Sequence, residues 1–546
     1  MKRLYWCIAL CLLAATSWAT PVCLGLSANA DPAAVVACSS LGVKLVRIRT
    51  NWPELQPDAK TWSFTRLDAA IREAVAHQLK VVLVLGPTPA WSITHLTNPS
   101  PEQVRRARPS LTAYTTYVTT LAKRYNGKVS YYQLWERPSA TTLLASDGFV
   151  QTLYSTGTQA LHKVHPTLQA IAAVPGGVNL GWIDEYLHAA IGPMRPDVLL
   201  LTPATYALAE DMTRWRIQPL RELVLPPNDA PVLWADLPLG GPHCCPKAVI
   251  AAALLQNLST LLFHPSQEDI NLMADEDAVK TLRLLQRVQG AEYLGYATPV
   301  PGVEMAVFRT TSALTGLLAP AKPVAIPLKS SAFPLPERVA VPGDAVELVP
   351  LDGEARKVLV SSETTLNIDA SLALLSGIAL TPTGKSPRDI SPAQDGDTVG
   401  FDPTGKNPSA ICPLPNLPGG KFTVSQHNDK IVIDTGGEEQ PWIYLEIPEG
   451  FLFFNKAKVP VEVTVKVYGV HEAQQSGFSI YYDAIGGMKH SPWQEIDIGE
   501  EVVHTYTLRL ADAMFADREG YALRLERGGS KEDIHLVDMR LRKLPK

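Results

Sequence analysis

Apolar and polar positions follow one pattern up to about residue 290 and a different one after it. In the first part, short apolar runs typical of buried strands alternate with stretches whose apolar residues recur at helical spacing. The predicted strands are Cys23–Ser27, Val43–Arg49, Lys80–Gly86, Val129–Trp135, Leu168–Val174, Asp197–Leu201, Pro231–Ala235 and Ser259–Phe263, and helical stretches between them include Thr65–His77, Ser110–Arg124, Phe149–Val164 and Ala248–Leu255. Such alternation predicts an α/β fold, a closed (β/α)8 TIM barrel, over residues 20–292. The alternative, a doubly wound open sheet, normally has a Gly-rich turn after an early strand, and the sequence has none there.

After residue 293 the strand-like runs are short and are separated by Pro, Gly and Asp. Residues 293–381 predict a small β-sandwich, and residues 382–407, rich in Pro, Gly, Asp and Ser, predict a linker. Within residues 408–546, Val461–Tyr468 alternates strictly between apolar and polar positions, as a strand with one wet face does. We therefore predict a C-terminal β-sandwich of the jelly-roll type there.

The first residues have the pattern of an export signal. Lys2 and Arg3 precede an apolar run that ends near Ala15, and small residues follow at Ser17 and Ala19. The run is shorter than the about 20 residues that a membrane-spanning helix needs. We therefore predict a signal peptide over residues 1–19 and a mature chain that is secreted, periplasmic or extracellular, without membrane insertion.

Disulfides are compatible with export. Among the cysteines outside the signal peptide, Cys23 and Cys38 flank the first predicted strand and helix, and they are the pair that we favour.

Two short motifs suggest metals, but each lacks ligands. Cys244 and Cys245 follow His243, and three such residues without a further ligand cluster are a weak case for zinc. Asp395 and Asp397 lack the additional oxygen ligands of a calcium loop. We predict no metal and no cofactor.

The charge of the chain argues against one class of binding partner, nucleic acids. The formal net charge is -5, and the sequence has no long basic run. Binding to phosphate backbones needs clustered Lys and Arg, so we expect no nucleic-acid partner.

Aromatic, arginine and carboxylate side chains follow several predicted barrel strands. The active site of a (β/α)8 barrel lies at the C-terminal ends of its strands. The residues there are Arg47 and Trp52 after the second strand, Trp91 after the third, Trp135, Glu136 and Arg137 after the fourth, Tyr206 after the sixth, and Trp234 and Asp236 at the seventh. A single Trp at such a place is more often a packing residue, but several aromatic side chains together favour a carbohydrate cleft, because they stack on sugar rings.

These segments resemble the superfamily of (β/α)8 retaining glycoside hydrolases, which take a proton donor from strand 4 and a nucleophile from strand 7. The motifs that carry the resemblance are Leu45-Val46-Arg47 with Trp52, Trp62-Ser63-Phe64 with Leu67-Asp68, Val84–Trp91, Tyr132–Trp135 and Pro231–Trp234. The resemblance implies a polysaccharide or oligosaccharide partner, Asp236 as the nucleophile, and substrate-binding roles for Arg47, Trp52, Trp91, Trp135, Arg137, Tyr206 and Trp234.

The catalytic positions depart from the pattern of that superfamily. Where it carries Trp-Asn-Glu-Pro, this chain has Trp135-Glu136-Arg137-Pro138, and an arginine cannot act as the proton donor because it stays protonated. One interpretation is hydrolysis of an O-glycosyl bond, with Asp236 as nucleophile and Glu136 as a displaced proton donor. Another is a catalytically inactive barrel, a pseudoenzyme that binds glycan or protein, with Arg137 paired to Asp236 or Glu136. A purely structural surface protein is the third.

The C-terminal unit carries its own resemblance. Phe478–Asp483, Leu508–Phe515 and Tyr521–Leu525 resemble jelly-roll modules that are appended to carbohydrate-active proteins. Trp493 and Tyr482 are candidates for sugar stacking, although most aromatic residues of such sandwiches lie in the core.

Overall fold

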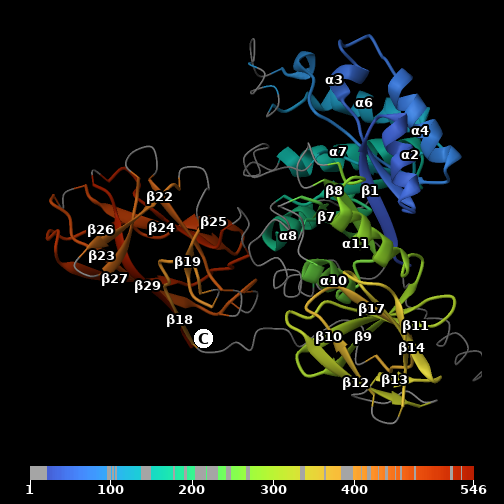
Figure 1. Cartoon of the computed structure of the whole chain (residues 1–546). Helices are drawn as coiled ribbons and strands as arrows, with labels where there is room; N and C mark the ends of the chain where they lie inside the picture. The colour runs from blue at the N-terminus through green and yellow to red at the C-terminus, as the bar shows by residue number, and fades with distance from the viewer. Residues whose placement is uncertain are drawn as a thin grey trace, which may run out of the picture. The chain divides into compact units, whose positions relative to one another are not determined.

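The computed structural model confirms the predicted closed barrel. Its strands follow one another around the ring in chain order. Parallel pairing of the last strand with the first closes the ring, and Figure 1 labels these two strands, β8 and β1, side by side. The barrel strands are β1 Cys23–Asn29, β2 Leu45–Arg49, β3 Lys80–Val84, β4 Tyr131–Gln133, β5 Gln169–Ala173, β6 Val198–Leu201, β7 Val232–Leu239 and β8 Thr260–Pro265. The structure describes residues 21–94, 100, 104, 107–136, 149–175, 179–189, 194–202, 217, 220, 231–241, 247–265, 271–331, 339–361, 364–382, 397–407, 409–414, 420–427, 430–436, 441–448, 451–455, 458–472, 475–516, 521–530 and 532–545.

Several predictions lie outside these residues. They are the signal peptide over 1–19, His243 with the Cys244-Cys245 pair, most of the predicted linker (383–396) with Asp395, and the site residues Arg137 and Tyr206. Among the described residues, no helix combines the length and the apolar character needed to span a bilayer.

Helices connect the barrel strands, and their apolar positions face the core. They are α2 Pro32–Ser40, α3 Trp52–Leu55, α4 Thr65–Ala76, the short 3-10 helix η1 Ala90–Ser92, α6 Leu111–Arg124, α7 Phe149–Val164, α8 Leu180–Ala189, α10 Lys247–Leu255 and α11 Glu276–Gln286. Helix α6 shows why these bounds arise. At the start of the helix, the Ser110 side chain accepts a hydrogen bond from the Ala113 amide. In its last turn, the positive charges of Lys123 and Arg124 interact favourably with the negative end of the helix dipole.

The small β-sandwich of the predicted fold follows the barrel. Its strands are β9 Glu292–Val300, β10 Val303–Arg309, β11 Leu314–Leu318, β12 Val324–Ser330, β13 Val339–Val341, β14 Ala345–Pro350, β15 Arg356–Leu359, β16 Thr364–Ile368 and β17 Ala373–Ile378. They form one sheet in the order β15-β14-β17-β11-β10-β9 and a smaller one in the order β13-β12-β16, around a common apolar core. The Tyr293 hydroxyl donates a 2.6 Å hydrogen bond to the Leu255 carbonyl, which ties β9 to the end of α10.

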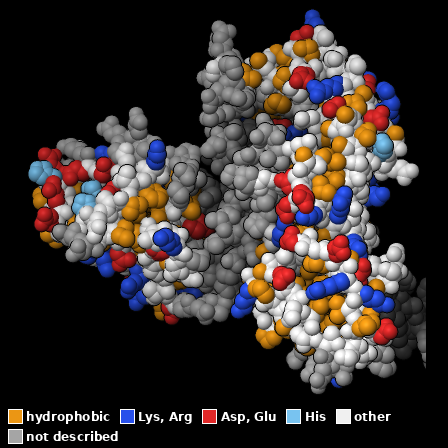
Figure 2. Space-filling view, viewed as in Figure 1, with side chains coloured by type: hydrophobic (Ala, Val, Ile, Leu, Met, Phe, Trp, Pro, Cys, Tyr) orange, Lys and Arg blue, Asp and Glu red, His pale blue; other side chains and the backbone are white. Residues whose placement is uncertain are grey.

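The C-terminal β-sandwich is built from two antiparallel sheets. Its strands are β18 Thr398–Gly400, β19 Cys412–Pro413, β20 Thr423–His427, β21 Lys430–Asp434, β22 Trp442–Glu446, β23 Val461–Tyr468, β24 Gly477–Ala484, β25 Gly487–His490, β26 Gln494–Glu495, β27 Val503–Leu510, β28 Leu523–Glu526 and β29 His535–Lys543. One sheet has the order β20-β21-β29-β23-β27 and the other β19-β22-β28-β24-β25, and apolar side chains fill the core of the unit. Figure 2 shows Lys and Arg interspersed with Asp and Glu over the described residues of one face, a mixture typical of a solvated surface.

Two details of this unit differ from the predictions. Strand β18 pairs with β29, so residues 398–400 of the predicted linker belong to the sandwich, because a Thr-Val-Gly run completes a sheet edge there. Tyr482 is only 7% exposed and lies in the core, with its hydroxyl donating to Asp512, whereas Trp493 is exposed. Of the two sugar-stacking candidates, only Trp493 therefore presents its ring to solvent.

A turn after β18 gives Asp402 an unusual acidity. The carboxylate accepts hydrogen bonds from the side chain and amide of Thr404 and from the amides of Lys406 and Asn407. These bonds stabilise the ionised form and lower the pKa of Asp402 to about 2. At pH values above the ordinary carboxyl pKa, the ionised Asp402 therefore stabilises the turn. This stabilisation is lost as the pH falls toward 2.

We expect the Asp402 carboxyl resonance to titrate with a midpoint near pH 2 in an NMR titration of the folded chain. The same titration in denaturant should give the ordinary value. A midpoint near 3.8 in the folded chain would mean that these hydrogen bonds do not form in solution.

The predicted Cys23–Cys38 disulfide is wrong in this structure. Both residues are free thiols: Cys23 lies in β1, Cys38 is a buried residue of α2, and the two do not form a disulfide. Burial raises the pKa of Cys38 to about 11, so the reactive thiolate is scarce at neutral pH.

We expect Cys38 to resist iodoacetamide in the native protein at about pH 8 and to react fully after unfolding. Peptide mass spectrometry of the alkylated, unreduced chain measures both states. A cross-linked Cys23–Cys38 peptide would contradict the free thiols.

Candidate functional site

A cluster of four polar side chains, three of them buried, lies inside the barrel. It joins Ser27 of β1, Arg47 of β2, Asp236 of β7 and His264 of β8, which are consecutive strands of the ring. Asp236 pairs in register with Leu262, two residues before His264, so the alternation of strand side chains sends Asp236 and His264 to the same face. The four side chains therefore meet inside the ring.

The distances show how the charges are satisfied. Arg47 Nη1 lies 2.9 Å from Asp236 Oδ2, and Arg47 Nε donates a 2.8 Å hydrogen bond to Ser27 Oγ. The Arg47–Asp236 contact is an ion pair by distance, but its angles are not those of a hydrogen bond. His264 Nδ1 lies 2.9 Å from Asp236 Oδ1. Because a guanidinium faces the carboxylate and favours its ionised form, we assign the proton of this contact to His264 Nδ1.

Asp236 lies deeper than the sequence predicts. The predicted strand ends at Ala235, but β7 continues to Leu239, since Leu237 and Leu239 alternate as buried strand residues. Asp236 is consequently inside the strand with 0% of its surface exposed, and Arg47 is 2% and His264 4% exposed. Arg47 and His264 both contact Asp236, and the predicted partner Arg137 lies outside the described residues.

Sequence reasoning did not single out His264. The predicted strand 8 ends at Phe263, whereas β8 reaches Pro265. The signal was present in the spacing, because His264 follows Leu262 by two positions and therefore shares its face.

The aromatic residues after strands 2 and 3 form a packed group. Trp52 is fully buried and stacks on Tyr117 with ring centroids 4.2 Å apart and an interplanar angle of 7°. Trp91 meets Trp52 edge-on at 6.1 Å and donates a 2.8 Å hydrogen bond to the Gln56 carbonyl. Trp52 therefore has no face open to a ligand in this structure, while Trp91 keeps part of its surface exposed.

The residues after strand 4 lie in a bend. Strand β4 ends at Gln133, two residues earlier than predicted, and the Gln133 side-chain amide donates a 2.9 Å hydrogen bond to the Trp135 carbonyl. Trp135 is 6% exposed and packs edge-on against Tyr114, whereas Glu136 is half-buried. Burial raises the pKa of Tyr117 well above its ordinary value, and the nearby charge of Glu136 adds to this shift.

The structure thus brings together Arg47 with Asp236 and Trp52 with Trp91. Trp234, the remaining aromatic candidate, lies in β7 and is 5% exposed. A group with metal-ligand chemistry that the sequence did not reveal lies elsewhere, in the C-terminal sandwich at His427, Asp434 and His535.

Comparison with known proteins gives structural matches alone. The sequence matches no family model and no curated protein. Among solved structures, a family 39 glycoside hydrolase from Bacteroides cellulosilyticus WH2 is 12% identical, with a TM-score of 0.49 over 65% of this chain and 81% of that one. A GH30 endoxylanase from Clostridium papyrosolvens C71 is 12% identical, with a TM-score of 0.47 over 66% and 97%. A GH39 enzyme from Xanthomonas axonopodis pv. citri is 11% identical, with a TM-score of 0.46 over 68% and 96%.

At this level of identity, the likeness concerns the fold. Barrels of this kind host many unrelated activities, so the function has to be argued from the side chains of this chain.

Proposed function

We propose that the chain is an exported barrel protein that binds a polysaccharide or oligosaccharide at the C-terminal ends of its barrel strands, with little or no glycosidase activity. The observation that carries this proposal is the complete burial of Asp236 between Arg47 and His264. In this arrangement the strand-7 carboxylate pairs with buried groups inside the barrel. The residues around the strand ends therefore form the binding surface.

The chemistry of retaining hydrolysis explains the low activity. It requires two carboxyl groups about 5–5.5 Å apart, one as nucleophile at the anomeric carbon and one as proton donor. A carboxylate with no exposed surface does not reach a substrate, and both oxygens of Asp236 face cationic or N–H groups. The strand-4 position of the donor carries Arg137.

Binding is supported by the residues at the strand ends. Trp91 and Glu136 keep part of their surface exposed after strands 3 and 4. An indole face with a neighbouring polar group is the combination that stacks on a sugar ring and fixes its hydroxyls. Hydrolysis by Asp236 with Glu136 as donor is the second candidate, and the half-buried Glu136 is the observation that favours it.

A glycan array probed with the mature chain tests the proposal. We expect at least one oligosaccharide class to bind, and Trp91→Ala to weaken its calorimetric affinity about tenfold, the equivalent of about 1.4 kcal/mol. Trp493→Ala is the matched control, because Trp493 is an exposed tryptophan of the C-terminal sandwich. An array without hits would contradict carbohydrate binding, and binding weakened only by the control would place the glycan site away from the barrel.

A further inference from the structure

We propose that the C-terminal sandwich binds a divalent transition-metal ion through His427, Asp434 and His535. One potential ligand atom from each residue lies within 4.8 Å of those of the other two. The three come from the end of β20, the end of β21 and the start of β29, which are neighbouring strands of one sheet. This inference is independent of the proposed carbohydrate function of the barrel.

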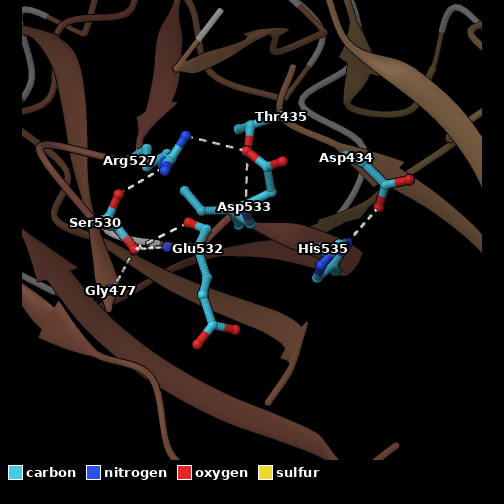
Figure 3. Close-up of polar contacts among 9 residues, drawn as sticks. Asp434, Thr435, Gly477, Arg527, Ser530, Glu532, Asp533 and His535 are labelled. Carbon is cyan, nitrogen blue, oxygen red and sulfur yellow. Dashed lines mark hydrogen bonds and ion pairs between the residues drawn. The ribbon is translucent and has the colours of Figure 1, made fainter. Parts of the chain in front are cut away.

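The geometry of the group is that of a half-open site. Asp434 pairs in register with His535, and His535 Nδ1 lies 2.7 Å from Asp434 Oδ1 (Figure 3). The rings of His427 and His535 are 5.6 Å apart between centroids, at 51° to each other. Asp434 is 9% exposed, so its carboxylate lies at the buried side of the site. His427 is exposed, so its imidazole lies at the solvent side.

Neighbouring hydrogen bonds hold two of the ligands in place. Beside Asp434, the Thr435 hydroxyl donates a 2.8 Å hydrogen bond to Asp533 Oδ1 and accepts one of 2.9 Å from the Ile534 amide. Arg527 Nη1 lies 3.3 Å from the same Asp533 oxygen, and Figure 3 shows this network beside the Asp434–His535 pair. A site whose strand ends are fixed in advance loses little freedom when an ion binds.

A second contact fixes the carboxylate itself. The Ser425 hydroxyl donates to Asp434 Oδ2, while Oδ1 faces His535. An ion bound by Asp434 Oδ1 and His535 Nδ1 takes the place of the proton that these two atoms share. The hydrogen bond from Ser425 then keeps the ligating carboxylate oriented, a common arrangement around protein metal sites.

The donor set selects the class of ion. Imidazole nitrogen suits zinc, copper and nickel, whereas calcium and magnesium prefer sites made wholly of oxygen ligands. Two atoms bound to a tetrahedral ion at about 2.1 Å lie about 3.4 Å apart, so a shift of the exposed His427 side chain by about 1 Å closes the site.

Titration of the full chain with zinc chloride, followed by calorimetry and by metal analysis after gel filtration, tests the proposal. We expect one zinc ion per chain, competition by nickel, and no competition by calcium. His427→Ala is the main test variant, because His427 is exposed and its truncation is expected to leave the fold intact. This variant should weaken zinc binding at least about tenfold. His535→Ala should do the same if its melting curve shows a folded sandwich.

His471→Ala is the matched control, since the His471 side chain is 78% exposed in the same unit and lies outside the cluster. It should bind zinc as the unchanged chain does. The proposal is overturned if the unchanged chain binds no zinc. It is equally overturned if zinc binding persists unweakened in His427→Ala, and loss of that binding after cysteine alkylation would assign the ion to cysteines instead.

Discussion

Arg47→Met is expected to lower the free energy of unfolding of the barrel by about 3–5 kcal/mol, the effect of removing one partner from a buried ion pair. The guanidinium is the charge that neutralises Asp236, and neither side chain has more than 3% of its surface exposed. Without it, the carboxylate is left buried with His264 beside it, at a large cost in desolvation. Urea unfolding followed by tryptophan fluorescence measures the change.

Arg309→Met is the matched control for this variant. Arg309 pairs with Glu292 at 3.0 Å, but the two side chains are 61% and 45% exposed, so its loss should cost less than about 1 kcal/mol. The double variant Arg47→Met with Asp236→Leu should recover much of the lost stability, because an apolar pair of similar size can replace a buried ion pair. Equal midpoints for Arg47→Met and Arg309→Met would show that the buried cluster does not support the barrel.

Trp52→Ala is expected to destabilise the chain by about 3–5 kcal/mol, as the loss of a large buried aromatic side chain does. Trp52 is fully buried, stacks on Tyr117, and donates a 2.9 Å hydrogen bond to the Gln56 side chain, so the truncation leaves a cavity and an unpaired carbonyl oxygen. Thermal and urea unfolding measure the loss. Trp493→Ala, at a 42% exposed position, should change stability by less than about 1 kcal/mol.

The stability and glycan binding of Trp52→Ala together distinguish two roles for Trp52. If Trp52→Ala remains as stable as the unchanged chain and loses glycan binding, Trp52 is the substrate-binding residue that the sequence predicts. A large loss of stability assigns it to the core.

The barrel could be predicted from the sequence because local patterns determine it. Each predicted strand of residues 20–292 is present, and Phe149–Val164 is a helix with the predicted bounds. Strand ends were less predictable. Strand β7 contains Pro238, a residue that normally signals a strand end, yet its pairing with β8 continues in register to Leu239.

The candidate site was predictable only in part. Arg47 and Asp236 were recognised by their places at strands 2 and 7, but their pairing depends on how far each strand carries its side chain into the ring. The buried state of Trp52 depends on Tyr117, which lies in a different helix and contacts it only after folding. The His427, Asp434 and His535 group unites positions about a hundred residues apart, and the spacing of the sequence contains no sign of it.

Turnover of a panel of aryl glycosides by the unchanged chain and by Asp236→Asn tests most directly whether the barrel binds carbohydrate without cleaving it. Glycan-array ligands confirmed by calorimetry establish beforehand that the preparation binds carbohydrate. With Asp236 buried between Arg47 and His264, we expect both proteins to release no more aglycone than the buffer control. Robust turnover by the unchanged chain that Asp236→Asn abolishes would contradict the account and establish Asp236 as a working nucleophile.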